Sequence, residues 1–262
     1  MNAPEFRHRK TDGQKISVTT CYDYWSARIL RETAIDAILV GDSAAMVMHG
    51  HDSTLPATVE LMALHTEAVA RGAPDKFIIG DMPFLSFRKG LARAMDSVGI
   101  LVQAGAEAIK VEGVEGHEDI IEHIAKSGVP VMGHIGLTPQ AVHQLGGFKI
   151  QGVGEEAAAA LLEQARKLEA AGCFSMVLEC VPVDTARDIT EAVTIPTIGI
   201  GAGPHCDGQV LVLHDLLGFN RDFKPKFVRG FENGYEMVRK AVDAFDRETK
   251  SGGFPTDSES YS

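Results

Sequence analysis

Three carboxylates end short apolar runs at comparable places along the chain. Asp42 ends the run AILVGD, Asp81 ends FIIGD and Glu112 ends AIKVE. Carboxylate oxygens are hard ligands of the kind that Mg²⁺ takes from proteins, and no Cys or His cluster accompanies them to favour zinc. For any one acid the alternative is a structural role, as the cap of the next helix or in an ion pair, since Asp is favoured at strand-to-helix turns. Three acids in succession favour a metal site.

Two basic residues lie on or beside the same kind of strand end. Lys110 precedes Glu112 by two residues, so in a strand both side chains point to the same side. The Lys110 ammonium can bind a carboxylate or stabilise an enolate, or it forms a salt bridge in the interior. His134 is a candidate donor to an oxygen of the ligand, and the small Gly133 before it is expected to leave room for that ligand.

Two further residues, Glu179 and Ser43, are candidates for proton transfer and for anion binding. Glu179 ends the run SMVLE, and partial burial would make this carboxylate ready to take up a proton as a general base. An ion pair at the rim is the structural alternative. Ser43, next to Asp42, can offer its hydroxyl and backbone N–H to an anion. The glycine-rich run at 198–203 fits a phosphate cradle or close backbone packing equally well, because its spacing is not that of a nucleotide fingerprint.

A repeated alternation of strand and helix positions these residues. Apolar runs predict eight strands, at 15–21, 37–42, 77–81, 108–112, 129–134, 175–179, 195–201 and 209–213. Helical patterns follow them at 25–33, 58–71, 91–104, 118–127, 155–171 and 185–192, with a last helix at 231–248. Gly105, Gly128 and Gly172 are expected to end helices in the left-handed conformation. Eight alternations predict an α/β fold, the (β/α)8 TIM barrel, whose strand ends converge on one ligand-binding face.

Three segments lie outside this repeat. The Gly-rich segment 137–154 follows a strand end and is expected to be a lid or a subunit contact, and segment 47–56 has the same kind of position. Residues 251–262 are rich in Gly, Ser and Asp and are predicted to be disordered. We therefore expect one barrel domain over residues 1–262 with a disordered tail.

Composition excludes several classes of protein. A length of 262 residues with 45% hydrophobic content suits a single barrel, and a formal net charge of −11 argues against nucleic acid as a partner. The four cysteines form no CxxC pair, which argues against a zinc site and a disulfide scaffold and favours a reducing compartment. The sequence shows neither an apolar leader nor a run of roughly 18 apolar residues. We expect a cytoplasmic protein that does not bind membranes.

The strand-end motifs and several loop motifs together resemble one enzyme family. In order, these motifs are LVGDS, HGHDSTLPAT, GDMPF, IKVEG, GHIGLTPQ, GGFKIQG, LECVP, IPTIGIGAG and DGQVLVLHDLLG. From residue 15 to residue 227 the chain closely resembles the ketopantoate (3-methyl-2-oxobutanoate) hydroxymethyltransferases. The resemblance implies a barrel of the phosphoenolpyruvate/pyruvate type, one Mg²⁺ per subunit, 5,10-methylenetetrahydrofolate as co-substrate, and a homodecamer.

The resemblance also implies a reaction and a role for each strand-end residue. A hydroxymethyl group passes from the folate to 3-methyl-2-oxobutanoate through a Mg²⁺-stabilised enolate, which gives 2-dehydropantoate for pantothenate synthesis. The implied metal ligands are Asp42, Asp81 and Glu112; the implied substrate-binding residues are Ser43, Asp42, Asp81, Lys110 and His134; the implied catalytic base is Glu179.

Two other functions stay open at this stage. The first is another Mg²⁺-dependent lyase or mutase on the same barrel, which forms a similar enolate with nearly the same residues. Those lyases carry a catalytic cysteine loop, and none of the four cysteines lies in a segment of that kind. The second is a barrel without catalytic activity, in which the acids only bind metal or pair with Lys110.

Overall fold

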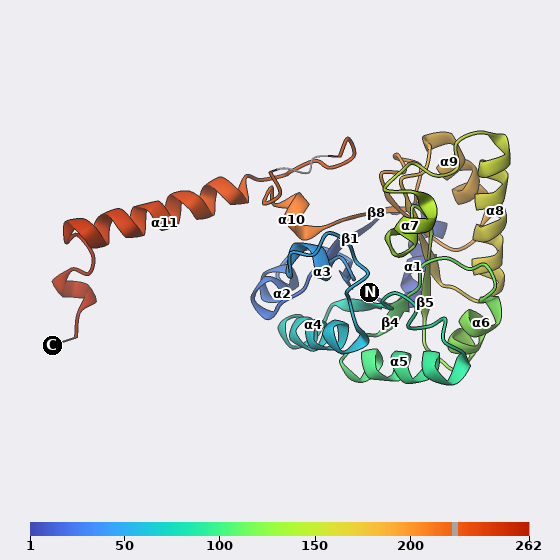
Figure 1. The fold of residues 1–262 in the computed structure, drawn as a ribbon, viewed down its shortest axis with the longest axis horizontal. Helices are drawn as coiled ribbons and strands as arrows, with labels where there is room; N and C mark the ends of the chain where they lie inside the picture. The colour runs from blue at the N-terminus through green and yellow to red at the C-terminus, as the bar shows by residue number, and fades with distance from the viewer. Residues whose placement is uncertain (222–224, 262) are drawn as a thin grey trace. The chain divides into compact units, whose positions relative to one another are not determined.

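Eight parallel strands form a closed barrel in sequence order, and β8 pairs with β1 (Figure 1). The structure is a computed structural model that describes residues 1–221 and 225–261. The strands are β1 (Ile16–Thr20), β2 (Ala37–Val40), β3 (Phe77–Asp81), β4 (Ala108–Lys110), β5 (Val131–Gly136), β6 (Ser175–Glu179), β7 (Thr197–Ile200) and β8 (Gly208–Leu211). The predicted (β/α)8 barrel is confirmed.

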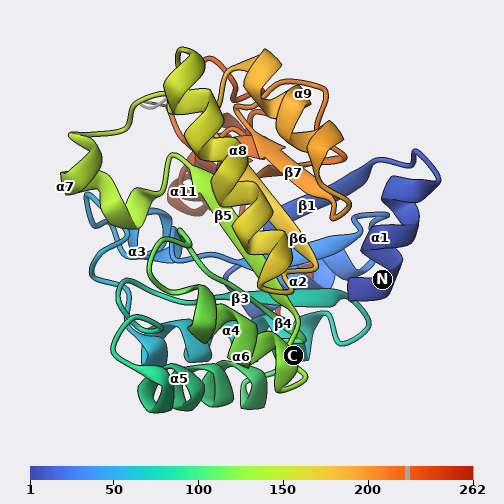
Figure 2. The ribbon, with the colours of Figure 1, turned by 90° about the vertical axis from the view of Figure 1, so that its right-hand side faces the viewer.

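Helices between the strands cover the outside of the barrel, and Figure 2 shows α8 lying across β5 and β6. The longer ones are α2 (Tyr24–Arg31), α4 (Val59–Gly72), α5 (Leu91–Gln103), α6 (Glu118–Lys126), α8 (Glu155–Ala170) and α9 (Val183–Ala192). Short helices α3 (Ala44–Val47), η1 (Pro139–Ala141) and α7 (Val142–Leu145) lie in the loops after β2 and β5. The expected left-handed glycines have φ of 108°, 93° and 89° at Gly105, Gly128 and Gly172.

An additional helix, α1 (Ala3–Thr11), precedes the first strand and was not predicted from the sequence. The side chain of Asn2 caps its first turn. Phe6 is fully buried, and its ring meets those of Phe77 and Phe174 edge to face at centroid distances of 5.7 and 5.4 Å. Because these two rings lie at the starts of β3 and β6, α1 closes the N-terminal end of the barrel.

The barrel interior is apolar near the strand starts and polar near the strand ends. Alternate side chains of a strand point to the same side, so Asp81 follows the core residue Ile79 and Lys110 follows Ala108 on the inner face. His134 follows Met132, and Glu179 follows Val177, by the same rule. The polar half of the interior therefore brings the predicted site residues together at the C-terminal ends of the strands.

The chain divides into two compact units, Met1–Leu211 and Val212–Ser262. The second contains α10 (Leu213–Leu216), α11 (Gly234–Ser251) and η2 (Asp257–Glu259). Helix α11 is the predicted last helix and begins three residues later than expected, where the side chain of Asn233 accepts a hydrogen bond from the N–H of Glu236.

The short helix η2 lies inside the tail 251–262, of which Ser262 is outside the described residues. The expectations of one domain and of a disordered tail stay predictions. Within residues 1–221 and 225–261, no helix is both long and apolar enough to cross a bilayer.

Candidate active site and metal centre

Three acids from neighbouring strand ends form a buried cluster. Asp42, Asp81 and Glu112 are only 4%, 1% and 2% exposed, and one possible ligand atom from each lies within 4.8 Å of the others. The backbone N–H of Asp42 donates to Oδ2 of Asp81 at 3.1 Å. Buried carboxylates this close repel one another unless a cation lies among them. The arrangement therefore suits a divalent cation with oxygen ligands.

Lys110 supplies one positive charge to this cluster. Its Nζ lies 2.7 Å from both carboxylate oxygens of Asp81 and 3.5 Å from Oε1 of Glu112. Burial alone would lower the pKa of Lys110, but the negative charges of the neighbouring acids outweigh this effect and raise the pKa. Lys110 is therefore an ammonium held among carboxylates.

The acids respond differently to their shared burial. The pKa of Asp42 is raised well above its ordinary value by burial and by repulsion from Asp81 and Glu112, and burial also raises the pKa of Asp81. Burial would raise the pKa of Glu112 as well, but attraction to Lys110 and His134 is stronger and lowers it to about 2. Lys110 and His134 therefore favour the ionised form of Glu112, whereas burial makes Asp42 and Asp81 bind a proton more readily than exposed acids do.

His134 lies between the acidic cluster and Glu179. Its Nδ1 is 3.3 Å from Oε1 of Glu112, and its Nε2 is 3.3 Å from Oε2 of Glu179. Neither contact has the geometry of a hydrogen bond. Burial alone would lower the pKa of His134, but the charge of Glu112 raises it to about 9. The imidazolium therefore connects the cluster to Glu179, whose side chain is 18% exposed.

Ser43 has a partner that the sequence did not indicate. Its Oγ lies 2.8 Å from Oη of Tyr22, a residue that follows β1. Ser43 precedes α3 and makes no capping hydrogen bond with its side chain. The hydroxyl is therefore held by a second hydroxyl, beside the cluster residue Asp42.

Two more residues bind the cluster and were not identified from the sequence. Gln140 of η1 donates from Nε2 to Oδ2 of Asp42 at 2.8 Å and to the carbonyl of Met82 at 2.9 Å. Its backbone N–H donates to Oε2 of Glu112 at 3.0 Å. Arg88 donates to the backbone carbonyl of Glu112. The only sequence signal for Gln140 was its place in the long segment after β5, which does not single out one residue.

The structure corrects one prediction about glycine, at Gly133, and favours one of the two interpretations of the glycine-rich run 198–203. The prediction that Gly133 leaves room for a ligand is wrong, because a Cβ there would lie 2.5 Å from Cδ1 of Leu168 on α8. Gly133 points outward, opposite to His134, and lets α8 pack closely. In the run 198–203, a Cβ at Gly199 would lie 3.0 Å from Sγ of Cys206, so close packing is the interpretation that the structure supports there.

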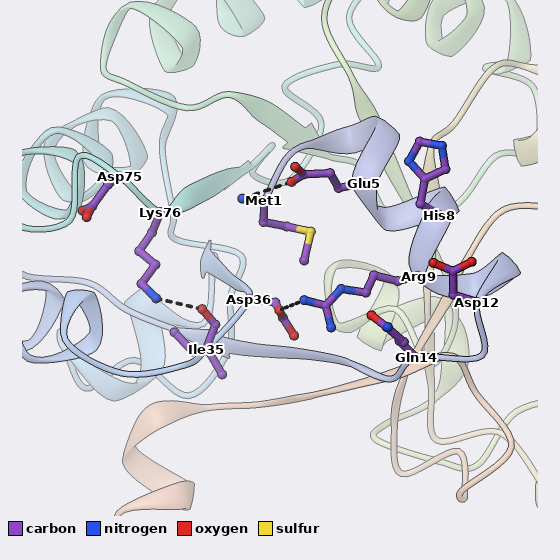
Figure 3. A pocket seen from close by; sticks show the side chains of 10 residues that line it. All are labelled: Met1, Glu5, His8, Arg9, Asp12, Gln14, Ile35, Asp36, Asp75 and Lys76. Carbon is purple, nitrogen blue, oxygen red and sulfur yellow. Dashed lines mark hydrogen bonds and ion pairs between the residues drawn. The ribbon is translucent and has the colours of Figure 1, made fainter.

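A polar hollow lies at the opposite end of the barrel (Figure 3). Its lining includes residues of α1 and residues that precede β1, β2 and β3. Several of its charged groups already have partners: Arg9 pairs with Asp36 at 3.1 Å, and Nζ of Lys76 donates to the carbonyl of Ile35 at 3.0 Å. This hollow contains none of the predicted site residues, which fits a structural role in seating α1.

Solved structures with the same barrel establish the class of fold. The 2,3-dimethylmalate lyase, described as a member of the PEP mutase/isocitrate lyase superfamily, aligns with a TM-score of 0.63 at 17% identity, over 99% of this chain and 91% of its own. Phosphonopyruvate hydrolase, solved with oxalate and Mg²⁺, gives a TM-score of 0.64 at 12% identity, over 99% and 93%. The chain therefore shares the α/β barrel fold of these proteins.

Sequence comparison then gives the family. The sequence model of ketopantoate hydroxymethyltransferase matches residues 1–257, and the chain belongs to this family. It is 58% identical to the 3-methyl-2-oxobutanoate hydroxymethyltransferase of Coxiella burnetii over 97% of this chain and 96% of that protein. It is 54% identical to the enzyme of the same name from Bdellovibrio bacteriovorus, over 98% of both chains. The resemblance seen in the motifs is confirmed and extends beyond residues 15–227.

Proposed function

We propose that the chain transfers a hydroxymethyl group from 5,10-methylenetetrahydrofolate to 3-methyl-2-oxobutanoate, which gives 2-dehydropantoate for pantothenate biosynthesis. The observation that carries this proposal is the 58% identity to a 3-methyl-2-oxobutanoate hydroxymethyltransferase over almost the whole chain. The geometry supports it, because three buried acids, a lysine, a histidine and a further carboxylate meet at one end of the barrel.

The three clustered acids are the proposed ligands of one Mg²⁺. Asp42, Asp81 and Glu112 offer hard oxygen atoms close together, and all three side chains are buried. When bound, the ion supplies electrostatic stabilisation for negative charge that develops on the 2-oxo group of the substrate. Three buried carboxyl groups with possible ligand atoms within 4.8 Å of one another fit a bound Mg²⁺.

Ser43, Lys110 and His134 are the proposed contacts of the oxoacid, together with Asp42 and Asp81. Lys110 and His134 are positively charged and almost fully buried, so each can attract a carboxylate or an enolate oxygen with little screening by water. The hydroxyl of Ser43 can donate a hydrogen bond while its own oxygen accepts one from Tyr22. These three donors fit an anionic substrate.

Glu179 is the proposed base. Its carboxylate takes the proton from C3 of the oxoacid, and the electron pair of the broken C–H bond delocalises toward the 2-oxo oxygen. C3 then forms the new carbon–carbon bond with the one-carbon unit, whose two C–N bonds to the folate break. Water supplies the oxygen of the new hydroxymethyl group, and tetrahydrofolate leaves as the second product. His134 holds the Glu179 side chain from the cluster side, 3.3 Å away, and so helps to orient it.

A second copy of the chain is part of the proposal, since the family implies a homodecamer. On α11, exposed apolar side chains recur at helical spacing, at Tyr235, Val238, Val242 and Phe245. Such a row of apolar side chains is typical of a helix that packs against a partner surface. We expect a decamer by native mass spectrometry, and a monomer at micromolar concentration would contradict it. We also propose a cytoplasmic location, as expected from the sequence.

The purified full chain tests the proposed reaction directly. With Mg²⁺ present, 3-methyl-2-oxobutanoate and 5,10-methylenetetrahydrofolate should disappear together as 2-dehydropantoate forms, and omission of any component should stop turnover. Cleavage of a 2-hydroxy-diacid or a phosphonate by the same preparation, without folate-dependent turnover, would instead favour a lyase or mutase.

A further inference from the structure

Gln140 joins two of the proposed metal ligands to the segment 137–154. Its side-chain amide bonds Oδ2 of Asp42 at 2.8 Å, and its backbone N–H bonds Oε2 of Glu112 at 3.0 Å. The residue is 6% exposed, whereas the residues on either side of it are half-buried and most of those from His143 to Gly154 are exposed. One residue of the segment therefore reaches into the buried cluster from outside it.

The chemistry of these contacts suits a residue that orients the acids without replacing a cation. Amide N–H groups carry no net charge, so they reduce the repulsion between Asp42 and Glu112 less than a lysine would. For the same reason they compete less with a metal ion for these carboxylates. Each acid is engaged through one oxygen. Among the described residues, Oδ1 of Asp42 accepts no hydrogen bond, and Oε1 of Glu112 has contacts only at 3.3 Å or more.

A third contact fixes the direction of the Gln140 side chain. The same Nε2 donates to the carbonyl of Met82, the residue after Asp81, at 2.9 Å. Both hydrogens of the amide therefore have acceptors, and the orientation of the amide is determined. Gln140 contacts the loop ends of β2, β3 and β4 from a segment that follows β5.

From these contacts we infer that Gln140 is a positioning residue that couples docking of segment 137–154 to cation binding at Asp42, Asp81 and Glu112. The inference rests on the proposed function, because it takes the acids as metal ligands. Docking orients two of the carboxylates before the cation arrives, and the bound cation in turn favours the docked segment. Thermodynamic linkage requires the two effects to be reciprocal.

Gln140→Met tests the inference, since it preserves length and removes both amide hydrogens. Mg²⁺ affinity of the full-length protein, measured by calorimetry without substrate, should fall roughly 10- to 100-fold, the range for groups that orient metal ligands. The matched control is Gln144→Met, which changes an exposed glutamine in the same segment. The Mg²⁺ affinity of this variant should equal that of the wild type. Both substitutions keep the backbone N–H bond to Glu112. Gln140→Asn also keeps an amide, on a shorter side chain, and should lower Mg²⁺ affinity less than Gln140→Met does.

Hydrogen exchange provides a readout that a merely structural role would not move. Mg²⁺ should slow the exchange of backbone amides across 137–154 in the wild type and in Gln144→Met. In Gln140→Met the slowing by Mg²⁺ should be much smaller. Equal Mg²⁺ affinity in Gln140→Met and wild type would overturn the inference. Absence of Mg²⁺ binding by the wild type would instead overturn the proposed metal site. If Gln140→Met does not fold, the comparison of Gln140→Asn with Gln144→Met decides.

Discussion

The Nε2 atom of His134 lies 3.3 Å from Oε2 of Glu179, while the other ring nitrogen faces Glu112 at the same distance. One imidazole ring therefore separates the carboxylate that is proposed to hold the metal from the one that is proposed to move the proton. Because the ring is positively charged in this setting, it attracts both acids and keeps them apart.

Substitution of Glu179 should separate catalysis from binding. In Glu179→Gln, the side chain keeps its size but cannot take up a proton, so kcat should fall roughly 100- to 10,000-fold. Binding of Mg²⁺ and of 3-methyl-2-oxobutanoate, measured by calorimetry, should change little. A large loss of oxoacid affinity with kcat preserved would show that Glu179 binds substrate and does not act as the base.

Asp81→Asn should weaken the metal site more than any change outside the ligand set. The amide keeps the shape of the side chain but loses its negative charge, so Mg²⁺ affinity should fall by more than ~100-fold, the upper range for supporting residues. Circular dichroism should show a folded barrel. An unchanged Mg²⁺ titration in a folded Asp81→Asn would remove Asp81 from the ligands.

Removal of the Lys110 charge should make stability depend on the metal. Lys110→Met leaves three buried acids without their ammonium, which should cost about 3–5 kcal/mol of unfolding free energy in the absence of Mg²⁺. Added Mg²⁺ should restore stability to this variant more than to the wild type. Lys126→Met, which removes an exposed lysine paired with Glu122, is the control and should change stability by less than about 1 kcal/mol. Equal melting temperatures of the two variants without Mg²⁺ would contradict this account of Lys110.

The end of β5 needs a glycine beside the backbone of Glu179. Gly136 has φ of 92°, and a Cβ there would overlap the carbonyl oxygen of Glu179. Gly136→Ala should therefore lose about 1–3 kcal/mol of stability and also lower kcat, because Glu179 must shift. Gly90→Ala isolates the backbone strain, since Gly90 has φ of 93° and open space around it. Equal loss of kcat in both variants would argue against a specific effect at Glu179.

The sequence predicted the strand-end residues because their position depends on a local rule. Asp81, Lys110, His134 and Glu179 each follow an apolar run in register, and alternation within a strand decides which side they face. The same rule shows why the interpretation of Gly133 was wrong. Being the immediate neighbour of the inward-facing His134, Gly133 has to point outward, toward α8.

Residues placed by the path of a loop or by long-range packing were not predicted. Gln140 reaches Asp42 across 98 positions of sequence, and no local pattern specifies such a contact. Phe6 closes the barrel by packing on Phe77 and Phe174, which depends on the closure of the whole sheet. The capping residue Asn2 and the proline in the first turn were available as signals for α1.

Exchange of the C3 proton of 3-methyl-2-oxobutanoate with D₂O, followed by NMR in the absence of folate, tests the central claim most directly. The account predicts exchange by the wild type that requires Mg²⁺ and is largely lost in both Asp81→Asn and Glu179→Gln. Exchange by Glu179→Gln at the wild-type rate, or wild-type exchange that is unaffected by removal of Mg²⁺, would contradict the division of roles between the acid cluster and Glu179.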